Sequence, residues 1–414
     1  MRRVVVTGLG ALTPIGNSIP DYLRALQSGI SGANIITYFD ATNFKTQFAC
    51  ELKDFDAEAF IDKREVRRLD KFSIYALVAA DEAFQHAGLD TEKLDLARAG
   101  VIWASGIGGL RSLEEEIVYN ATSDSPRYNP FMIPKMIGNM GAGHISMKYG
   151  FRGPSYGTVS ACASTGHALG AAADDIRLGR SDVMIVGGSE AAVTAVGIGG
   201  FGAMKALSTR NEDFATASRP YDADRDGFVL GEGAGCLILE ELEHAQARGA
   251  TIYAELLGYA ATSDAYHITA PHPEGLGASA CMRDALKYAG VNTSDVNYIN
   301  THGTSTPLGD VAELKAIQQV FGEAAYKMNI SSTKSMTGHL LGVPGAIEAI
   351  ACILAIQHNF IPPTINHFTD DPEIDKGLNL TFNEAQEKVV EVALIILFGF
   401  GGHNSAAVFG RFKG

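Results

Sequence analysis

"STGHALG" at residues 164–170 returns as "MTGHLLG" at residues 336–342, with the same residue at five of the seven positions. A short β-type segment precedes each copy, "YGTVSA" before the first and "MNISST" before the second. In this context the repeat predicts two related halves, each with the TGHxLG positions in the first turns of a helix that follows a strand. Chance recurrence of small residues in a glycine-rich chain is the alternative.

The repeat also pairs ionisable residues. Aligning the two copies places Cys162 opposite Lys334 and His167 opposite His339. Two equivalent helix N-termini would bring these groups to one place, so the repeat is the first indication of an active site.

Outside the repeat, apolar strand-like runs alternate with helical stretches. Runs such as "GVIWASG" and "VMIVGGSEA" are nearly continuous in apolar or small residues, as strands buried on both faces are, and the sequence therefore predicts an α/β fold. The helix in "LEELEHAQARG" ends at Gly249, and a new strand begins at about residue 252. We therefore expect one half at residues 1–250 and another at residues 251–414.

Composition excludes several classes of protein. The 414 residues are 46% apolar without a low-complexity tract, which indicates a globular chain, and no apolar run reaches the roughly 18–20 residues of a membrane span. A net charge of -14 argues against general nucleic-acid binding, so an anionic partner must meet a local basic patch. Five cysteines without a CxxC pair indicate a reducing compartment, and we expect the cytoplasm.

Cys162 stands where the first copy's helix is expected to start. Helix N-terminal amides favour a thiolate and would lower the pKa of the thiol below its usual value of about 8.5. Cys162 is therefore a candidate nucleophile for covalent acyl transfer, and an inert buried cysteine is the alternative.

Histidines supply the other candidate groups. His302 lies in the Gly/Thr/Pro-rich loop "NTHGTSTPLGD", from which a ring N–H can be donated into a cleft. It is a better functional candidate than His167. The segment "STKSMTGH" adds Lys334 and His339, and "FGFGGHN" at residues 398–404 adds a flexible glycine-rich segment.

These motifs resemble a known family. "SACAST", "THGTSTPLGD", "STKSMTGHLLG" and "FGFGGHN" occur in the order and spacing of the β-ketoacyl-[acyl-carrier-protein] synthases. "RPYDADRDGFVLGEGAG" and "DAYHITAP" further resemble the type II elongating members of that family (KAS II). The resemblance implies a thiolase fold, with two similar α/β halves, each with a five-stranded mixed sheet, stacked as α-β-α-β-α layers and assembled as a homodimer.

The resemblance also implies a reaction. A cysteine takes an acyl group from acyl carrier protein, malonyl-carrier protein loses CO2, and the resulting enolate attacks the acyl-cysteine to give a 3-oxoacyl product. By this matching Cys162 is the nucleophile, and the backbone N–H groups of Cys162 and Phe398 stabilise the oxyanion. His302 and His339 serve the malonyl half, with Lys334 as their electrostatic organiser.

Further roles follow from the same matching. Glu348 would be the partner of Lys334, Thr304 and Thr306 would hold the phosphopantetheine arm, and Phe398 would gate an acyl tunnel. Apolar side chains suit an alkyl chain, and Ile107 and Phe201 would line that tunnel.

A basic run is the expected docking surface for the acidic carrier protein. "DKREVRRLDK" at residues 62–71 spaces its basic residues by three and four, so that several can share one helix face. These residues are Lys63, Arg64, Arg67, Arg68 and Lys71. A solvated helix with internal ion pairs is the alternative. We expect no nucleic-acid or membrane partner.

Two departures from the family pattern affect the cofactor and a helix. Ile395, Ile396 and Leu397 replace a polar triplet that helps to form a monovalent-cation site in some members, together with positions matching Asn300 and Glu348. We therefore expect no cofactor. Whether a monovalent cation binds is left open by the sequence. Val343-Pro344 replaces two small residues and is expected to kink a helix.

The sequence argues against several related functions. A biosynthetic thiolase would need a second cysteine near "GFGGHN", a type III initiating synthase would have asparagine at position 339, and a non-catalytic chain-length subunit should lack Cys162. An active ketosynthase of a type II polyketide pathway shares the motifs and stays an alternative. The sequence does not determine the acyl chain length.

Overall fold

The computed structural model describes residues 2–414 and contains the same five-stranded arrangement twice. In the first, the strand order is β1-β7-β6-β4-β5, and in the second it is β8-β14-β13-β9-β10. Counted from β1 in the first and from β8 in the second, the first two strand pairings are antiparallel and the last two are parallel. The strands are β1 (Val4–Leu12), β4 (Ala99–Ala104), β5 (Ser155–Thr158), β6 (Val183–Glu190), β7 (Gly233–Glu241), β8 (Ala254–Ser263), β9 (Tyr298–Asn300), β10 (Asn329–Ser331), β13 (Val392–Gly399) and β14 (His403–Gly410). Matching order and direction show two related halves.

The two five-stranded arrangements are joined by one short strand pairing. β1 pairs with β8 through Val5 with Glu255 and Val6 with Ala254, which joins all ten strands into one hydrogen-bonded sheet. Two small antiparallel pairs lie outside it, β2 (Asn34–Ile35) with β3 (Phe48–Ala49) and β11 (Phe360–Ile361) with β12 (Gln386–Glu387). The division into residues 1–250 and 251–414 stays a prediction, although its boundary lies between β7 and β8.

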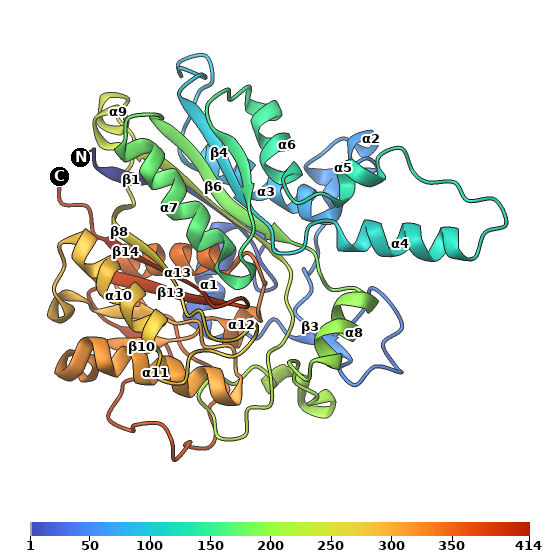
Figure 1. The fold of residues 1–414 in the computed structure, drawn as a ribbon. Coiled ribbons are helices and arrows are strands. Elements are labelled where there is room, and N and C mark those ends of the chain that lie inside the picture. Colours follow the sequence, from blue (N-terminus) through green and yellow to red (C-terminus); the bar gives the residue numbers. More distant parts are fainter. Residues whose placement is uncertain (1) are drawn as a thin grey trace.

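Helices form three layers around the two halves (Figure 1). α3 (Lys71–His86) and α6 (Met140–Tyr149) pack on the first half, and α10 (Leu276–Ala289) and α11 (Pro307–Phe321) pack on the second. α7 (Ser164–Arg177) and α13 (Pro344–His358) share a central core with strands of both halves. The result is the expected α-β-α-β-α order of a thiolase fold.

The composition of α13 explains its central position. Residues 344–356 of this helix are all buried, and a helix that is apolar on every side must be covered on every side. Glu348 is the one carboxylic acid in that buried stretch, and Lys334 pairs with it.

The repeated sequence does not mark equivalent helices. The first copy opens α7 as expected, but the second copy runs from the short α12 (Lys334–Thr337) into irregular chain, with Leu341 at φ 50°. The second central helix begins only at Pro344. The alignment of Cys162 with Lys334 is therefore wrong, because the element that occupies α7's position is α13.

The expected kink at Pro344 is also wrong. Pro344 occupies the first turn of α13. There a proline removes no intrahelical hydrogen bond, and its fixed φ suits the helix start.

The remaining helices are α1 (Ile19–Ser28), α2 (Lys63–Val66), α4 (Leu110–Ala121), α5 (Met132–Met136), α8 (Ala195–Ala203) and α9 (Leu242–Ala247). α1 packs on the central core through Tyr22 and Leu26. α4 projects from the body and is followed by a long loop that returns to α5 (Figure 1). No helix within residues 2–414 is long and apolar enough to cross a bilayer.

Candidate active site

Cys162 lies in a short 3-10 turn, Ala161–Ala163, directly before α7. Ser164 fixes this turn, since its hydroxyl donates to the carbonyl of Ala161 (2.6 Å) and accepts from the N–H of Ser160 (2.8 Å). Ala161 has φ 50°, an uncommon conformation for a residue with a side chain. The turn presents the thiol of Cys162 at the ends of both central helices, where it is nearly buried.

His339 reaches Cys162 from the second half of the chain. Its backbone pairs with the segment around Leu230, donating to Val229 (2.8 Å) and accepting from Gly231 (2.9 Å). Nε2 of His339 lies 3.0 Å from Sγ of Cys162. A short β-bridge therefore holds one histidine in contact with the thiol.

His302 follows β9 and is held by a buried carboxylate. Glu313 on α11 accepts from the backbone N–H of His302 (2.6 Å) and of Gly303 (2.7 Å). The His302 ring lies 5.4 Å from the His339 ring and 5.7 Å from the Phe398 ring, centroid to centroid. Two histidines thus face the region of the thiol.

The three predicted reactive groups converge. Sγ of Cys162 and a ring nitrogen of each of His302 and His339 lie within 4.8 Å of one another. A zinc ion accepts one thiolate and two imidazoles, but the nearby ammonium of Lys334 disfavours a divalent cation here. The same groups suit acyl transfer, with a nucleophile and two hydrogen-bond donors around one carbonyl.

Burial keeps both histidines neutral. Desolvation lowers the pKa of His302 and of His339 well below the usual value, and the Lys334 charge lowers both further. A neutral imidazole donates from one ring nitrogen. Both rings can therefore serve as N–H donors at neutral pH without carrying charge.

Burial also decides the state of the nucleophile. It raises the pKa of the Cys162 thiol to about 12, although Lys334 and the backbone N–H groups of Phe400 and Cys162 act in the opposite direction. The expected lowering of this pKa is therefore wrong, because desolvation outweighs the amides at the start of α7.

The second N–H directed at the thiol comes from Phe400, two residues beyond the expected Phe398. Between them, Gly399 runs so close to the turn that an added Cβ would stand 2.6 Å from the carbonyl oxygen of Ser160. This close approach brings the glycine-rich segment onto Cys162. The N–H directed at the thiol is thus that of Phe400 and not that of Phe398.

Lys334 lies behind the histidines. Its ammonium forms an ion pair with Glu348 and a 3.4 Å hydrogen bond to the carbonyl of Thr301, and both charged side chains are almost inaccessible to solvent. The structure thus brings Glu348 to Lys334 as expected. His167 lies apart from this group, bonded through Nδ1 to the hydroxyl of Ser160 (2.6 Å).

A cavity of about 620 Å³ leads to the reactive groups. All the residues expected along the substrate path line it, and Thr304 and Thr306 are joined there through their hydroxyl oxygens (3.1 Å). These residues are Ile107, Phe201, Thr304, Thr306 and Phe398. Phe228 and Leu341 add apolar surface that the sequence did not single out.

The basic run 62–71 does not form one helix. α2 ends at Val66, and Asp70 caps a new helix, α3, that starts at Lys71. Lys71 turns inward, with its ammonium 3.4 Å from the centroid of the Tyr38 ring, and Lys63 pairs with Glu58 (3.3 Å). The expectation of one helix over this run is therefore wrong, and Lys63 and Lys71 do not join the other three basic side chains.

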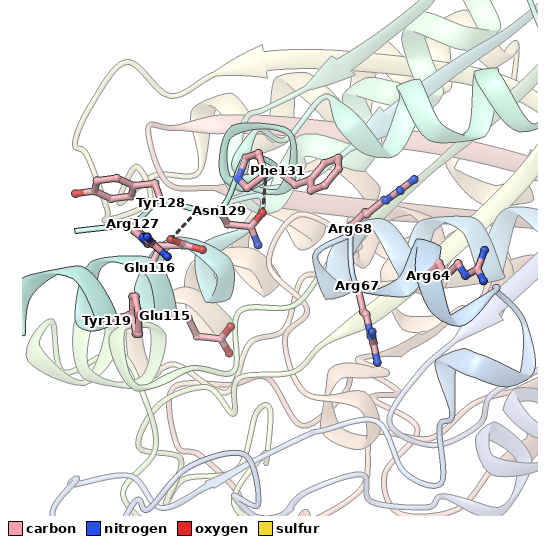
Figure 2. A pocket seen from close by; sticks show the side chains of 11 residues that line it. Arg64, Arg67, Arg68, Glu115, Glu116, Tyr119, Arg127, Tyr128, Asn129 and Phe131 are labelled. Atoms are coloured by element: carbon pink, nitrogen blue, oxygen red, sulfur yellow. Dashed lines mark hydrogen bonds between the residues drawn. The ribbon is translucent and has the colours of Figure 1, made fainter. Parts of the chain in front are cut away.

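Three of the five gather at a second cavity of about 730 Å³. Arg64, Arg67 and Arg68 line one side, and Arg127 with Phe131 lines the other (Figure 2). The Arg68 guanidinium lies 5.4 Å from the Phe131 ring centroid. Glu115 and Glu116 also line this cavity, so its four arginines leave an excess of two positive charges. This basic cavity, defined by its four arginines, is the remaining candidate for binding an acidic partner.

The sequence analysis missed three residues next to the site: Phe400, Glu313 and Glu190. "FGFGG" contains two phenylalanines, and motif matching alone did not separate them. Glu190 ends an apolar strand and Glu313 lies on a buried helix face. An acidic residue at the end of an apolar run is the signal that could have identified Glu190, since buried carboxylates need dedicated donors. Glu313 stands between Asp310 and Lys315 in a mixed sequence and has no such signal.

Comparisons with known proteins agree with this geometry. The sequence matches the model of "Beta-ketoacyl synthase, N-terminal domain" over residues 1–245 and that of "Beta-ketoacyl synthase, C-terminal domain" over residues 253–368. It is 49% identical over 412 residues to a 3-oxoacyl-[acyl-carrier-protein] synthase 2 of Synechocystis, covering 100% of this chain and 99% of the relative. A protein of the same name from Coxiella burnetii is 47% identical, with 99% of each chain covered.

Solved structures of ketosynthases are also similar to this chain. A type II polyketide ketosynthase in complex with its acyl-carrier protein superposes with a TM-score of 0.92 at 36% identity, with 100% of both chains covered. A β-ketoacyl synthase from Burkholderia phymatum superposes with a TM-score of 0.90 at 33% identity, again with 100% of both chains covered.

Proposed function

Because the chain belongs to the β-ketoacyl synthase family and is a condensing enzyme of fatty-acid elongation, an acyltransferase, we propose that Cys162, His302 and His339 carry out its two half-reactions in the 620 Å³ cavity. The observation that carries this proposal is the 3.0 Å contact between Nε2 of His339 and Sγ of Cys162, with His302 beside them. The polyketide alternative has weaker support, since the similar polyketide ketosynthase is 36% identical and the fatty-acid relatives are 47–49% identical.

In the first half-reaction Cys162 attacks the acyl thioester of the carrier protein. The S–C bond to the enzyme forms, the bond to the carrier's sulfur breaks, and the thiol proton of Cys162 ends on the released carrier thiol. Because the pKa of the free thiol is raised to about 12, the attack needs the N–H groups around Cys162. We assign the backbone N–H groups of Cys162 and Phe400 to the developing oxyanion, where one such donor typically contributes about 10²–10³ in rate.

In the second half-reaction the malonyl group on the carrier loses CO2. The electron pair of the broken C–C bond forms an enolate, whose oxygen accepts N–H donors from His302 and His339. The enolate carbon then attacks the acyl-cysteine, which forms the new C–C bond of the 3-oxoacyl product and breaks the S–C bond. Cys162 leaves as a thiolate and takes up a proton from solvent. Burial, with the charge of Lys334 adding to it, keeps both imidazoles neutral so that they donate without protonating the enolate carbon, and Glu348 holds Lys334 in place.

The substrate path follows the cavity lining. Thr304 and Thr306 hold the phosphopantetheine arm near the opening, and Ile107 and Phe201 contact the alkyl chain. The ring of Phe398 lies beside His302. We assign Phe398 as the gate between the site of the phosphopantetheine arm and the site of the alkyl chain.

We propose that the reaction needs no cofactor. The residues matched to the family's monovalent-cation site do not fit a cation. Ile395, Ile396 and Leu397 are buried and bring no side-chain oxygen, and the amide of Asn300 donates to the hydroxyl of Thr333 (3.2 Å).

The carrier protein is the proposed partner of the basic cavity formed by Arg64, Arg67, Arg68 and Arg127. An acidic partner complements four arginines on a chain of charge -14, and the solved polyketide relative is a ketosynthase bound to its carrier protein. We also propose a homodimer that pairs through β5, an edge strand with exposed Tyr156 and Val159. The five free thiols support a cytoplasmic location.

A paired experiment tests the assignment. Cys162→Ala should abolish transfer of a labelled acyl group to the protein but spare appreciable CO2 release from labelled malonyl-carrier protein. His302→Ala should reduce CO2 release and leave acylation of Cys162 largely intact. Stable acylation of the Cys162→Ala protein, or undiminished CO2 release by the His302→Ala protein, would contradict the assigned roles.

A further inference from the structure

Glu190, the last residue of β6, is a fully buried carboxylate beside the active site. Its Oε2 accepts from the backbone N–H of Gly106 (2.7 Å) and of Gly342 (3.1 Å). Its Oε1 accepts from the N–H of Ile107 (3.2 Å) and from the hydroxyl of Ser105 (3.1 Å). Four donors therefore converge on one side chain.

No cation compensates this carboxylate among the ion pairs of residues 2–414, which include Lys334 with Glu348 but none with Glu190. Burial raises the pKa of Glu190 to about 7, and the hydrogen bonds from Gly342, Gly106, Ile107 and Ser105 limit the rise. Neutral donors hold the group, so its charge changes near neutral pH.

The donors belong to two segments that shape the cavity. Gly106 and Ile107 form part of its wall, while Gly342 directly follows Leu341, which also lines it, and lies three residues after His339. An added Cβ on Gly342 would stand 2.4 Å from the N atom of Gly106, and one on Gly106 would stand 2.7 Å from Oε2 of Glu190. The two segments can close over the carboxylate because both contacts are made by glycine.

Glu82 shows what a purely structural carboxylate does in this protein. It accepts from the N–H of Ala11 (2.8 Å) and of Ile19 (2.7 Å), and burial raises its pKa as well. Neither glutamate lines the cavity, but Glu190 accepts from Gly106 and Ile107, which do. Burial is the main cause of the raised pKa of the Cys162 thiol, and the charge of Glu190 adds to it. Glu190 therefore combines a structural role with an effect on the nucleophile.

We propose that Glu190 is a positioning residue that binds the Ile107 wall of the acyl cavity to the segment carrying His339, and so sets both the acyl-length preference and the reactivity of Cys162. The length preference rests on the proposed function of the cavity, whereas the reactivity of the thiol does not. The two parts are therefore tested separately.

The first test uses alkylation of Cys162 by iodoacetamide, which needs neither carrier protein nor acyl substrate. Glu190→Gln removes the charge, so the thiolate becomes easier to form wherever Glu190 is ionised in the unsubstituted protein. The ratio of variant to unsubstituted alkylation rates should be near one at pH 6 and rise above one by pH 8.5, because Glu190 ionises over this range. The other groups that face the thiol, Lys334, His302 and His339, are common to both proteins and cancel in the ratio.

The matched control is Glu82→Gln, for which the ratio should stay near one at every pH. A ratio for Glu190→Gln that does not change between pH 6 and pH 8.5 would overturn the effect on the nucleophile, whatever the enzyme's substrate.

The second test measures kcat and KM across acyl chain lengths. In Glu190→Gln the amide NH2 faces backbone N–H donors, so the Ile107 wall loses its fixed position. We expect kcat/KM for the preferred chain to fall about tenfold, as loss of a charged hydrogen bond typically does, with a flatter profile over neighbouring lengths. A uniform fall at every length would show a structural role only and would overturn the length preference.

An experiment on the unsubstituted protein covers the case in which the variant does not fold. Amide exchange at Gly106 and Ile107, corrected for the intrinsic pH dependence, should become several-fold slower between pH 6 and pH 8 as Glu190 ionises and accepts more strongly. Ala11 and Ile19, bound by Glu82, serve as reference amides. Equal behaviour of both pairs would overturn the proposal.

Discussion

Gly166 of α7 and Gly345 of α13 are in direct contact, so that a Cβ added to Gly345 would stand 2.7 Å from the N atom of Gly166. Gly166 is equally constrained, since its own Cβ would stand 2.0 Å from Oγ of Ser405. The contact lies one turn after Cys162 and three residues before Glu348. It therefore sets the distance between the helix that presents the nucleophile and the helix that anchors Lys334.

Gly345→Ala should destabilise the protein, because the backbone of α7 cannot yield as a flexible side chain could. Overpacking of this kind typically costs about 1–3 kcal/mol, and we expect that loss in the free energy of unfolding from denaturant titration. Gly143→Ala in α6 is the control, since a Cβ there meets nothing within 4 Å, and alanine is favoured in a helix by about 1 kcal/mol. Equal stability of the two variants would contradict the close contact.

Part of the fold and of the candidate site could be predicted from the sequence, and part could not. Cys162, His302 and His339 could be identified because each stands in a short motif at the end of a strand or helix. The equivalence of the two halves was also correct, but the repeated TGHxLG sequence gave the wrong register. A helix start depends on capping and on proline, and Pro344 begins α13 well after the repeated histidine.

Two other misses have physical causes that lie outside the sequence. The pKa of Cys162 depends on how deeply the thiol is buried, which helix position does not reveal. The basic run had the right helical spacing, but Asp70 caps a new helix within it and turns Lys71 toward Tyr38. The burial of a side chain and the place where a helix ends both depend on tertiary packing.

The basic cavity leads to a prediction about the carrier protein. Arg67→Glu combined with Arg68→Glu should raise the KM for the carrier-bound substrate at least about tenfold and weaken its salt dependence, because two attractive charges become repulsive. Steady-state kinetics at several salt concentrations measure both effects. A small acyl-pantetheine thioester should react at the unsubstituted rate, since it does not reach this surface.

Lys63→Glu is the matched control for docking. Lys63 belongs to the same basic run, but it pairs with Glu58 and does not line the cavity. We expect little change in its carrier KM. If it weakened binding as much as the double variant, general charge rather than the basic cavity would explain the effect.

Phe398 leads to a prediction about the gate. Its ring lies beside His302, and the following Gly399 lacks the side chain that would limit backbone motion. Phe398→Ala should slow acylation by long chains and weaken the order in which the two substrates bind, while CO2 release persists. Acylation and decarboxylation are measured separately with labelled substrates. Acylation by long chains at the unsubstituted rate, with binding order retained, would refute the gate.

Buried carboxyls lead to a prediction about stability and pH. Burial raises the pKa of Glu190 from 4.5 to about 7 and that of Glu313 from 4.5 to about 8, while backbone N–H donors limit both shifts. Above pH 6.5 both groups are ionised in the unfolded chain, but they still bind protons in the folded protein. Stability must therefore fall as pH rises through 7 and 8.

The histidines oppose only part of this fall. Burial lowers the pKa values of His302 and His339, so the stability they contribute is lost on going to lower pH. Both side chains are still half protonated in the unfolded chain at pH 6.5, so this contribution rises by about 0.4 kcal/mol for each histidine up to about pH 7.5, which is less than the loss from the two carboxyls. Between pH 6.5 and pH 8.5 we expect the free energy of unfolding to fall by about 2 kcal/mol, from the value of about 1.4 kcal/mol per pKa unit. Urea titrations at fixed ionic strength measure it. Glu313→Gln should flatten the upper part of this fall, near pH 8, and a stability that rises from pH 6.5 to pH 8.5 would contradict the assignment of protonated carboxyls in the folded protein.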